Sequence, residues 1–283
     1  HREKVQRAAL LDLGLFSFRT FSWGNLTAAM VAVGEFAIIF VLPLYLINAF
    51  GMDVMGAGLV LAAMAVGAFL SGAAARHLAA RFGSPGTVLI GLGLEVLGVV
   101  VLALLIGPAT PGWLVAIPLT VYGLGLGLAS AQLTGTVLRD IPVEVSGQAS
   151  ATQSTVRQIG SALGTAFAGA ALSISLALTL PSALSAAGLT GDSATTLADA
   201  TRQSAGTTIT QLRAEGTHSS LGDQTAAAVD ALSAGFADAT RWALLVAAVF
   251  LVLGFIGAMR LRRASDVPPE VGPAGIEPTT STV

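Results

Sequence analysis

Two carboxylic acids lie in the middle of long apolar stretches, where ionised side chains are seldom found. Glu35 stands in the run 33–40 (VGEFAIIF), and Glu95 has Gly91 four residues before it and Gly98 three residues after it. An ionised carboxylate at the centre of a bilayer costs about 2.5 to 3.5 kcal/mol. Each acid must therefore be protonated, paired or in contact with water, which makes both candidate proton or cation carriers. The alternative for each is a structural hydrogen bond to a neighbouring helix.

The glycines around Glu95 predict its direction. On a helix, Gly91, Glu95 and Gly98 share one face. Small residues on a membrane helix let a second backbone approach closely. We therefore expect Glu95 to face other helices rather than lipid.

A third intramembrane charge lies on the stretch with the richest polar pattern, 151–178. Its polar residues form a stripe along one side of the predicted helix, which suits a water-filled cavity. Gly160 and Gly164 lie on a different face, which suits close packing against a neighbouring helix. Arg157 is expected to pair with Glu35 or Glu95 or to extend to the membrane surface, with attraction of an anionic substrate group as the alternative. The polar stripe consists of Ser150, Ser154, Arg157 or Gln158, Ser161 and Thr165.

Other polar and aromatic candidates carry a packing alternative. Gly123 and Gly127 mark the span of Tyr122 and Gln132 as a close-packed helix, so these two are packing residues first and substrate contacts second. The glycine run 123–127 is not a nucleotide loop, because no strand precedes it. Three aromatic residues could form an apolar pocket or face lipid: Phe36, Phe40 and Tyr45.

The elements that position these residues are five apolar stretches and a sixth of similar length, 151–178, that also carries polar residues. Hydrophobic residues make up 54% of the chain, charged residues 11%, and the mean hydropathy is +0.78. A bilayer core of about 30 Å takes about 20 residues of helix, and lipid leaves no water for an open backbone. The sequence predicts an all-α polytopic membrane protein whose six transmembrane helices form one bundle, with spans at 22–47, 54–75, 86–106, 113–134, 151–178 and 240–260.

Charge asymmetry predicts the orientation. Cytoplasmic loops retain positive charge, so segments 1–21 and 261–283 are expected in the cytoplasm, the latter as a disordered tail, and the protein is expected to be multi-pass in the plasma membrane. Segment 179–239 is expected outside, as a mobile solvated cap rather than a substrate vestibule or partner-binding unit. Ten of the fourteen basic residues lie on the proposed inner side: Arg2, Lys4, Arg7, Arg19, Arg76, Arg81, Arg139, Arg260, Arg262 and Arg263.

Apolar residues in the outer segment recur at helical spacings. Two amphipathic helices are expected there. Their apolar positions are Leu197, Ile209 and Leu212 for one and Val229, Leu232 and Phe236 for the other.

Several function classes are disfavoured. The chain has no cysteine, and His1, His77 and His218 all lie outside the spans. Thiolate chemistry is therefore excluded, and we expect neither a metal site nor a cofactor. No nucleophile and base face each other on the spans, so an intramembrane enzyme is not expected, nor is a nucleic-acid partner. A membrane scaffold remains an alternative, although it gives no reason for two acids at this depth.

Four segments resemble a known family. The segments 147–153 (GQASATQ) and 157–164 (RQIGSALG), together with 10–16 (LLDLGLF) and 42–46 (LPLYL), are similar to the C-terminal half of the 14-helix drug:proton antiporter branch of the major facilitator superfamily. The resemblance implies a second, N-terminal bundle that is absent here. The chain also begins inside a charged segment at His1 without an initiator Met, so we expect it to be part of a longer protein.

The segment 76–83 (RHLAARFG) resembles the family's cytoplasmic gating motif. Arg81 and Gly83 match it, whereas Arg76 replaces the first glycine, Ala80 the aspartate, and Ser84 with Pro85 the basic pair. The resemblance therefore implies that the charge relay of the motif resides in the first half of the transporter.

The resemblance implies proton-coupled efflux of hydrophobic or cationic small molecules by alternating access. Glu35 and Glu95 would bind protons and substrate cation in competition. The partners would be the substrate, protons, the bilayer and the N-terminal bundle or a second copy of the chain. The nearest alternative is an exporter of a polar metabolite such as an amino acid or a sugar. The substrate cavity would be lined by Phe36, Tyr122, Gln132, Gln153, Ser154, Arg157, Gln158 and Ser161.

Overall fold

A computed structural model describes residues 13–108 and 110–265, and every regular element in these residues is a helix. Six of these helices are long and apolar enough to cross a membrane, as the sequence predicts. Two shorter helices, α6 (Asp192–Gln203) and α7 (Thr207–Glu215), lie between the last two of them. The six long helices are α1 (Arg19–Leu44), α2 (Val54–Phe82), α3 (Ser84–Leu105), α4 (Gly112–Val137), α5 (Ser146–Ala186) and α8 (Thr225–Ser265).

Several helices extend beyond the predicted spans. Helix α2 continues to Phe82, so Arg76 and Arg81 lie on its last turns and not in a loop. The connection to α3 is the single residue Gly83, whose φ of +74° is readily adopted only by glycine. Helix α8 continues to Ser265, which corrects the expected tail at 261–265; residues 266–283 lie outside the described residues.

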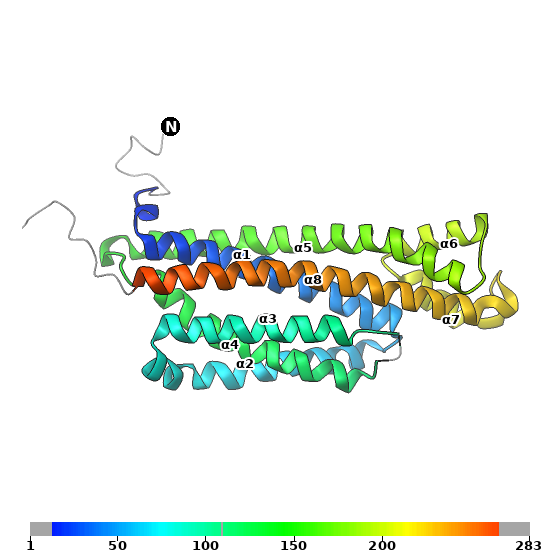
Figure 1. The fold of residues 1–283 in the computed structure, drawn as a ribbon, viewed down its shortest axis with the longest axis horizontal. Coiled ribbons are helices and arrows are strands. Elements are labelled where there is room, and N and C mark those ends of the chain that lie inside the picture. Colours follow the sequence, from blue (N-terminus) through cyan, green and yellow to red (C-terminus); the bar gives the residue numbers. More distant parts are fainter. Residues whose placement is uncertain (1–12, 109, 266–283) are drawn as a thin grey trace, which may run out of the picture.

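The six long helices form two groups of three (Figure 1). Helix α1 packs on α5 and α8, and α4 packs on α2 and α3, while α3 and α8 join the groups. Exchanging α1 with α4, α2 with α5 and α3 with α8 reproduces these pairings. Because α1 and α4 begin at opposite ends of the bundle (Figure 1), the consecutive triplets α1, α2, α3 and α4, α5, α8 are related as inverted repeats, and each spatial group takes helices from both.

Glycines lie at the closest contacts between helices. A Cβ atom on Gly164 would overlap the carbonyl oxygen of Val33, and one on Gly160 would lie 2.7 Å from that of Ala29. Between α2 and α4, a Cβ on Gly67 would lie 2.5 Å from the carbonyl oxygen of Thr120. These pairs therefore pack backbone against backbone, as small-residue contacts in membranes allow.

The outer segment folds into a helical cap. Helices α5 and α8 project beyond the ends of α2, α3 and α4, and α6 and α7 pack between these projections (Figure 1). Ile209 and Leu212 of α7 are buried in the same apolar cluster as Leu232 and Phe236 of α8. The first predicted amphipathic pattern thus spans α6 and α7, whereas the second belongs to the start of α8.

Arginines from other helices hold the ends of two spans at this capped end. Pro43 is followed by a π-helical turn, Tyr45–Ala49, which extends α1. Arg213 of α7 donates to the carbonyl oxygens of Asn48 (3.4 Å) and Ala49 (2.9 Å). Arg241 of α8 donates to those of Ala103 (3.2 Å) and Ile106 (2.8 Å) at the end of α3. A cation at a helix C-terminus satisfies carbonyl groups that have no partner within the helix.

Replacing Arg213 tests whether it fixes the cap. Hydrogen bonds to a charged group contribute about 1.5 to 3 kcal/mol, so we expect Arg213→Gln to speed deuterium uptake across Thr207–Glu215 by roughly tenfold. Hydrogen exchange with mass spectrometry measures this. Arg202→Gln is the matched control, because Arg202 pairs with Asp199 of its own helix. Equal uptake in the two variants would show that Arg213 does not hold the cap.

Candidate functional site

Glu35 is paired with an arginine from the polar stripe. Its Oε2 lies 4.0 Å from Nη2 of Arg157, and the side chains of Glu35 and Arg157 are 14% and 43% exposed. The pairing predicted for Arg157 is therefore confirmed. The two side chains face each other because Gly160 and Gly164 bring α5 against α1 at Ala29 and Val33. Because the Arg157 side chain is partly exposed, solvent screens the attraction and makes this ion pair weaker than a buried one.

Glu95 is completely buried between α3 and α4, as its glycine neighbours predict. A Cβ on Gly125 of α4 would lie 2.6 Å from the backbone nitrogen of Glu95 and 2.9 Å from its Cγ. One turn along α3, Gly98 meets the backbone of Tyr122 in the same way. Neither carboxyl oxygen of Glu95 has a hydrogen-bond partner among the described residues, nor does the hydroxyl of Tyr122.

The bundle thus brings three titratable groups from three helices together. Glu35 lies within electrostatic range of Glu95, and Tyr122 lies within range of both acids. Burying an ionised carboxyl without a partner costs several kcal/mol. A bound proton, a cation or a water molecule reduces this cost. Chemically, the arrangement can therefore hold and release a proton or bind a positive charge between α1, α3 and α4.

The predicted substrate-cavity residues do not form one enclosed set in the described residues. Tyr122, Gln153 and Ser161 are buried between helices, which fits the packing alternative for Tyr122. Gln132 and Arg157 are partly exposed, while Phe36, Ser154 and Gln158 lie open to the surroundings of the bundle. The eight residues therefore divide into an internal group and an open face.

The three predicted aromatic residues also separate. Phe36 and Phe40 are each 37% exposed, whereas Tyr45 is buried and donates a hydrogen bond of 2.7 Å to the carbonyl oxygen of Gly107. Tyr45 thus ties α1 to the connection between α3 and α4. It does not belong to a pocket with the other two.

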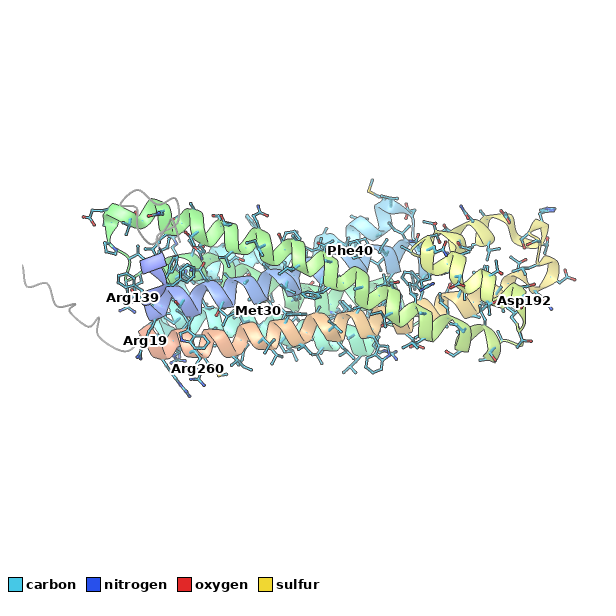
Figure 2. All side chains as sticks on the ribbon, turned by 90° about the horizontal axis from the view of Figure 1, so that it is seen from above. Arg19, Met30, Phe40, Arg139, Asp192 and Arg260 are labelled. Atoms are coloured by element: carbon cyan, nitrogen blue, oxygen red, sulfur yellow. The ribbon has the colours of Figure 1, made fainter. Side chains whose placement is uncertain are left out.

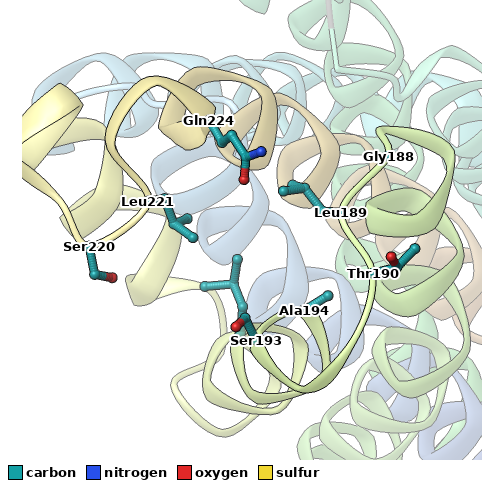
Figure 3. A pocket seen from close by; sticks show the side chains of 9 residues that line it. Gly188, Leu189, Thr190, Ser193, Ala194, Ser220, Leu221 and Gln224 are labelled. Carbon is teal, nitrogen blue, oxygen red and sulfur yellow. The ribbon is translucent and has the colours of Figure 1, made fainter.

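Two cavities lie in the cap. One of about 370 Å³ lies between the turn after α5, the start of α6 and the approach to α8 (Figure 3). Its walls carry hydroxyl and amide groups but no charged side chain among the described residues. A second, of about 340 Å³, is lined by Arg213 with Asp223 and Asp230. No described group of histidine, aspartate and glutamate residues could hold a metal ion.

Sequence reasoning missed the polar residues that act across long separations. Asn48 of the π-helical turn donates to the carbonyl oxygen of Ala205 at 2.9 Å, and Arg139 donates to that of Ser265 at 3.3 Å. The position of Asn48 and Arg139 at the ends of apolar spans indicates that they could bind helix ends. It does not identify their partners, which lie more than 120 residues away.

The fold and the buried acids define a class: a polytopic helical bundle of inverted three-helix repeats with ionisable groups inside the membrane, as in secondary transporters. The chain belongs to the Major Facilitator Superfamily, whose family profile matches residues 2–165. This family consists of membrane transporters, and the plasma membrane is the expected location.

Relatives include transporters with different named substrates. The chain is 30% identical over 166 residues to the riboflavin transporter RibZ of Clostridioides difficile, 28% over 168 residues to the multidrug efflux pump LfrA of Mycolicibacterium smegmatis, and 27% over 172 residues to the tetracenomycin C resistance and export protein of Streptomyces glaucescens. Each match covers 59% of this chain and 36%, 33% and 31% of the respective relative. The matched part is thus about a third of the length of these relatives.

A double-mutant cycle on Glu35 and Arg157 tests the ion pair. We expect Glu35→Gln and Arg157→Gln to be less than additive in the free energy of unfolding, with a coupling of about 0.5 to 1 kcal/mol because the arginine is partly exposed. Reversible unfolding in mixed micelles gives the energies. Pairing Arg157→Gln with Glu144→Gln, at an exposed position outside the spans, is the additive control. Strict additivity for Glu35 and Arg157 would rule out a direct interaction.

Proposed function

We propose that this chain is the C-terminal bundle of a proton-coupled exporter of hydrophobic or cationic small molecules. The observation that carries the proposal is the completely buried Glu95: neither of its carboxyl oxygens has a hydrogen-bond partner within residues 13–108 and 110–265, and Glu35 lies within electrostatic range. A structural acid would be hydrogen-bonded, because a buried unsatisfied group is costly. Two nearby acids repel each other when both are ionised, so binding a proton or a cation at one of them is favourable. Such a pair can exchange a proton for a cation.

The proposed cycle uses competition at the two acids. A proton that arrives from outside neutralises one carboxyl and weakens its hold on the cationic substrate, which then leaves outward. Release of the proton to the inside restores the negative charge for the next substrate. Arg157 contributes by keeping Glu35 oriented toward α5 through their 4.0 Å contact.

Alternating access requires a second bundle. The apolar cores of α2 and α5 have only 22% and 28% of their residues buried, whereas the other four long helices have 44% to 56%. These two helices therefore offer the surface against which an N-terminal bundle would pack. Exposed large residues on them include Phe69 and Leu70 of α2 and Ile159 of α5.

We also propose that the arginine-rich end faces the cytoplasm. This end is defined by Arg19, Arg76, Arg81, Arg139, Arg260, Arg262 and Arg263, and it contains the start of α1 and the end of α8. The capped end holds Arg202, Arg213 and Arg241, and these are bound to carboxylates or helix carbonyls. The bias follows the positive-inside rule.

A polar substrate is the second candidate. Ser154 and Gln158 are exposed on the open face of α5 beside Arg157, and the relative RibZ is named a riboflavin transporter. Such a face offers hydrogen bonds that a purely apolar compound would not use.

Proton flux in the protein assembled with its N-terminal bundle tests the proposal. We expect Glu35→Gln and Glu95→Gln each to abolish substrate-driven proton movement into vesicles, because a neutral amide neither carries a proton nor attracts a cation. A pH-sensitive dye inside the vesicles reports the flux, and Glu144→Gln is the control. Flux that persists in the double variant would refute the coupling role, while substrate uptake restricted to polar compounds would favour the second candidate.

A further inference from the structure

A short stretch of α1 remains uncovered near the arginine-rich end. Helix α5 crosses α1 where Gly160 and Gly164 meet Ala29 and Val33, near the labelled Met30 in Figure 2. Helices α5 and α8 meet further along, where the rings of Phe167 and Phe250 stack with their centroids 5.4 Å apart. On the side of the crossing that faces α8, Leu26 is 45% exposed and Trp23 and Met30 are partly exposed.

Two arginines frame this stretch. The guanidinium carbon of Arg260 on α8 lies 5.9 Å from the ring centroid of Trp23. Arg19 is exposed one turn before Trp23 on α1, at the same end of the bundle (Figure 2). Neither arginine is in an ion pair with an acid in residues 13–108 and 110–265, where the recorded pairs use Arg139, Arg157, Arg202 and Arg241.

We propose that Arg19, Trp23 and Arg260, with Leu26 and Met30 below them, bind an anionic phospholipid of the surrounding bilayer. Guanidinium groups bind phosphate oxygens with paired hydrogen bonds, and tryptophan prefers the level of the headgroups. The exposed Leu26 and Leu253 continue the surface toward the membrane centre, where an acyl chain lies. We call Leu26, Met30 and Leu253 the apolar floor of the site. A free phosphate ion would bind the arginines but would not contact this apolar floor.

The position of the site favours a lipid over a soluble partner. Arg260 follows 35 residues of a continuous helix that begins at Thr225, so it lies at the end of a membrane span. Basic residues at that level gain attraction from anionic headgroups. Arg139 at the same end differs, because it donates to the carbonyl oxygen of Ser265 and pairs with Asp140.

The test uses the tryptophans of the full chain, which has three of them. In the Trp113→Phe, Trp242→Phe variant, Trp23 is the sole reporter. The protein is placed in phosphatidylcholine vesicles that contain a small fraction of either brominated phosphatidylglycerol or brominated phosphatidylcholine, and fluorescence quenching gives the occupancy beside Trp23. We expect a preference for the anionic lipid on the order of fivefold for each arginine involved.

Variants and a second reporter make the result decisive. Arg260→Gln and Arg19→Gln should each reduce the preference, whereas Arg81→Gln on α2 should leave it unchanged, with circular dichroism verifying the fold of each variant. A reporter at Trp242 alone, near the capped end, should show no preference.

Equal quenching by both lipids, or full preference in Arg260→Gln, would overturn the site. Displacement of the lipid by inorganic phosphate at constant ionic strength would overturn the role of the apolar floor. The readout is binding, so the result is independent of the proposed transport.

Discussion

The close approach of helix backbones at glycines is the constraint on which the rest of the structure depends. Lipid tails are as apolar as leucine, so helices in a membrane gain little from burying apolar side chains against each other. Here Gly160 and Gly164 seat α5 on α1, while Gly91 and Gly98 seat α3 on α4. With larger residues at these positions the helices would separate by the width of a side chain, and the inverted-repeat packing would be lost.

The chemistry of the site follows from these contacts. Glu35 meets Arg157 because α1 and α5 touch, and Glu95 loses all access to water because Gly125 admits α3 against α4. The same packing leaves the carboxyl oxygens of Glu95 without a hydrogen-bond partner in the part of the chain that the structure describes. Dispersion contacts at the glycines thus offset the free-energy cost of burying the Glu95 carboxyl without a partner. Because this cost falls when the carboxyl binds a proton or a cation, the buried acid can respond to either.

The sequence predicts the parts of this architecture that depend on local pattern. Six helices follow from apolar length, and the direction of Glu95 follows from the spacing of Gly91 and Gly98, because both depend on residues within a few turns. The long extent of α2 was missed because Arg76 and Arg81 resemble loop residues, although exposed arginines are compatible with a helix that projects past the lipid. The anchoring of the predicted cap was missed because Arg213 binds carbonyl groups 164 and 165 residues away.

Disulfide trapping between α1 and α8 tests the glycine contacts most directly, because the chain has no cysteine of its own. A Cβ on Gly254 would lie 3.6 Å from the Cβ of Met30, within the range of about 3.5 to 4.5 Å that a disulfide spans. The structure predicts rapid oxidation of the Met30→Cys, Gly254→Cys variant and none of Met30→Cys, Val252→Cys, which points the second thiol to the other side of α8. Equal or reversed yields would contradict the packing of these helices at their glycines.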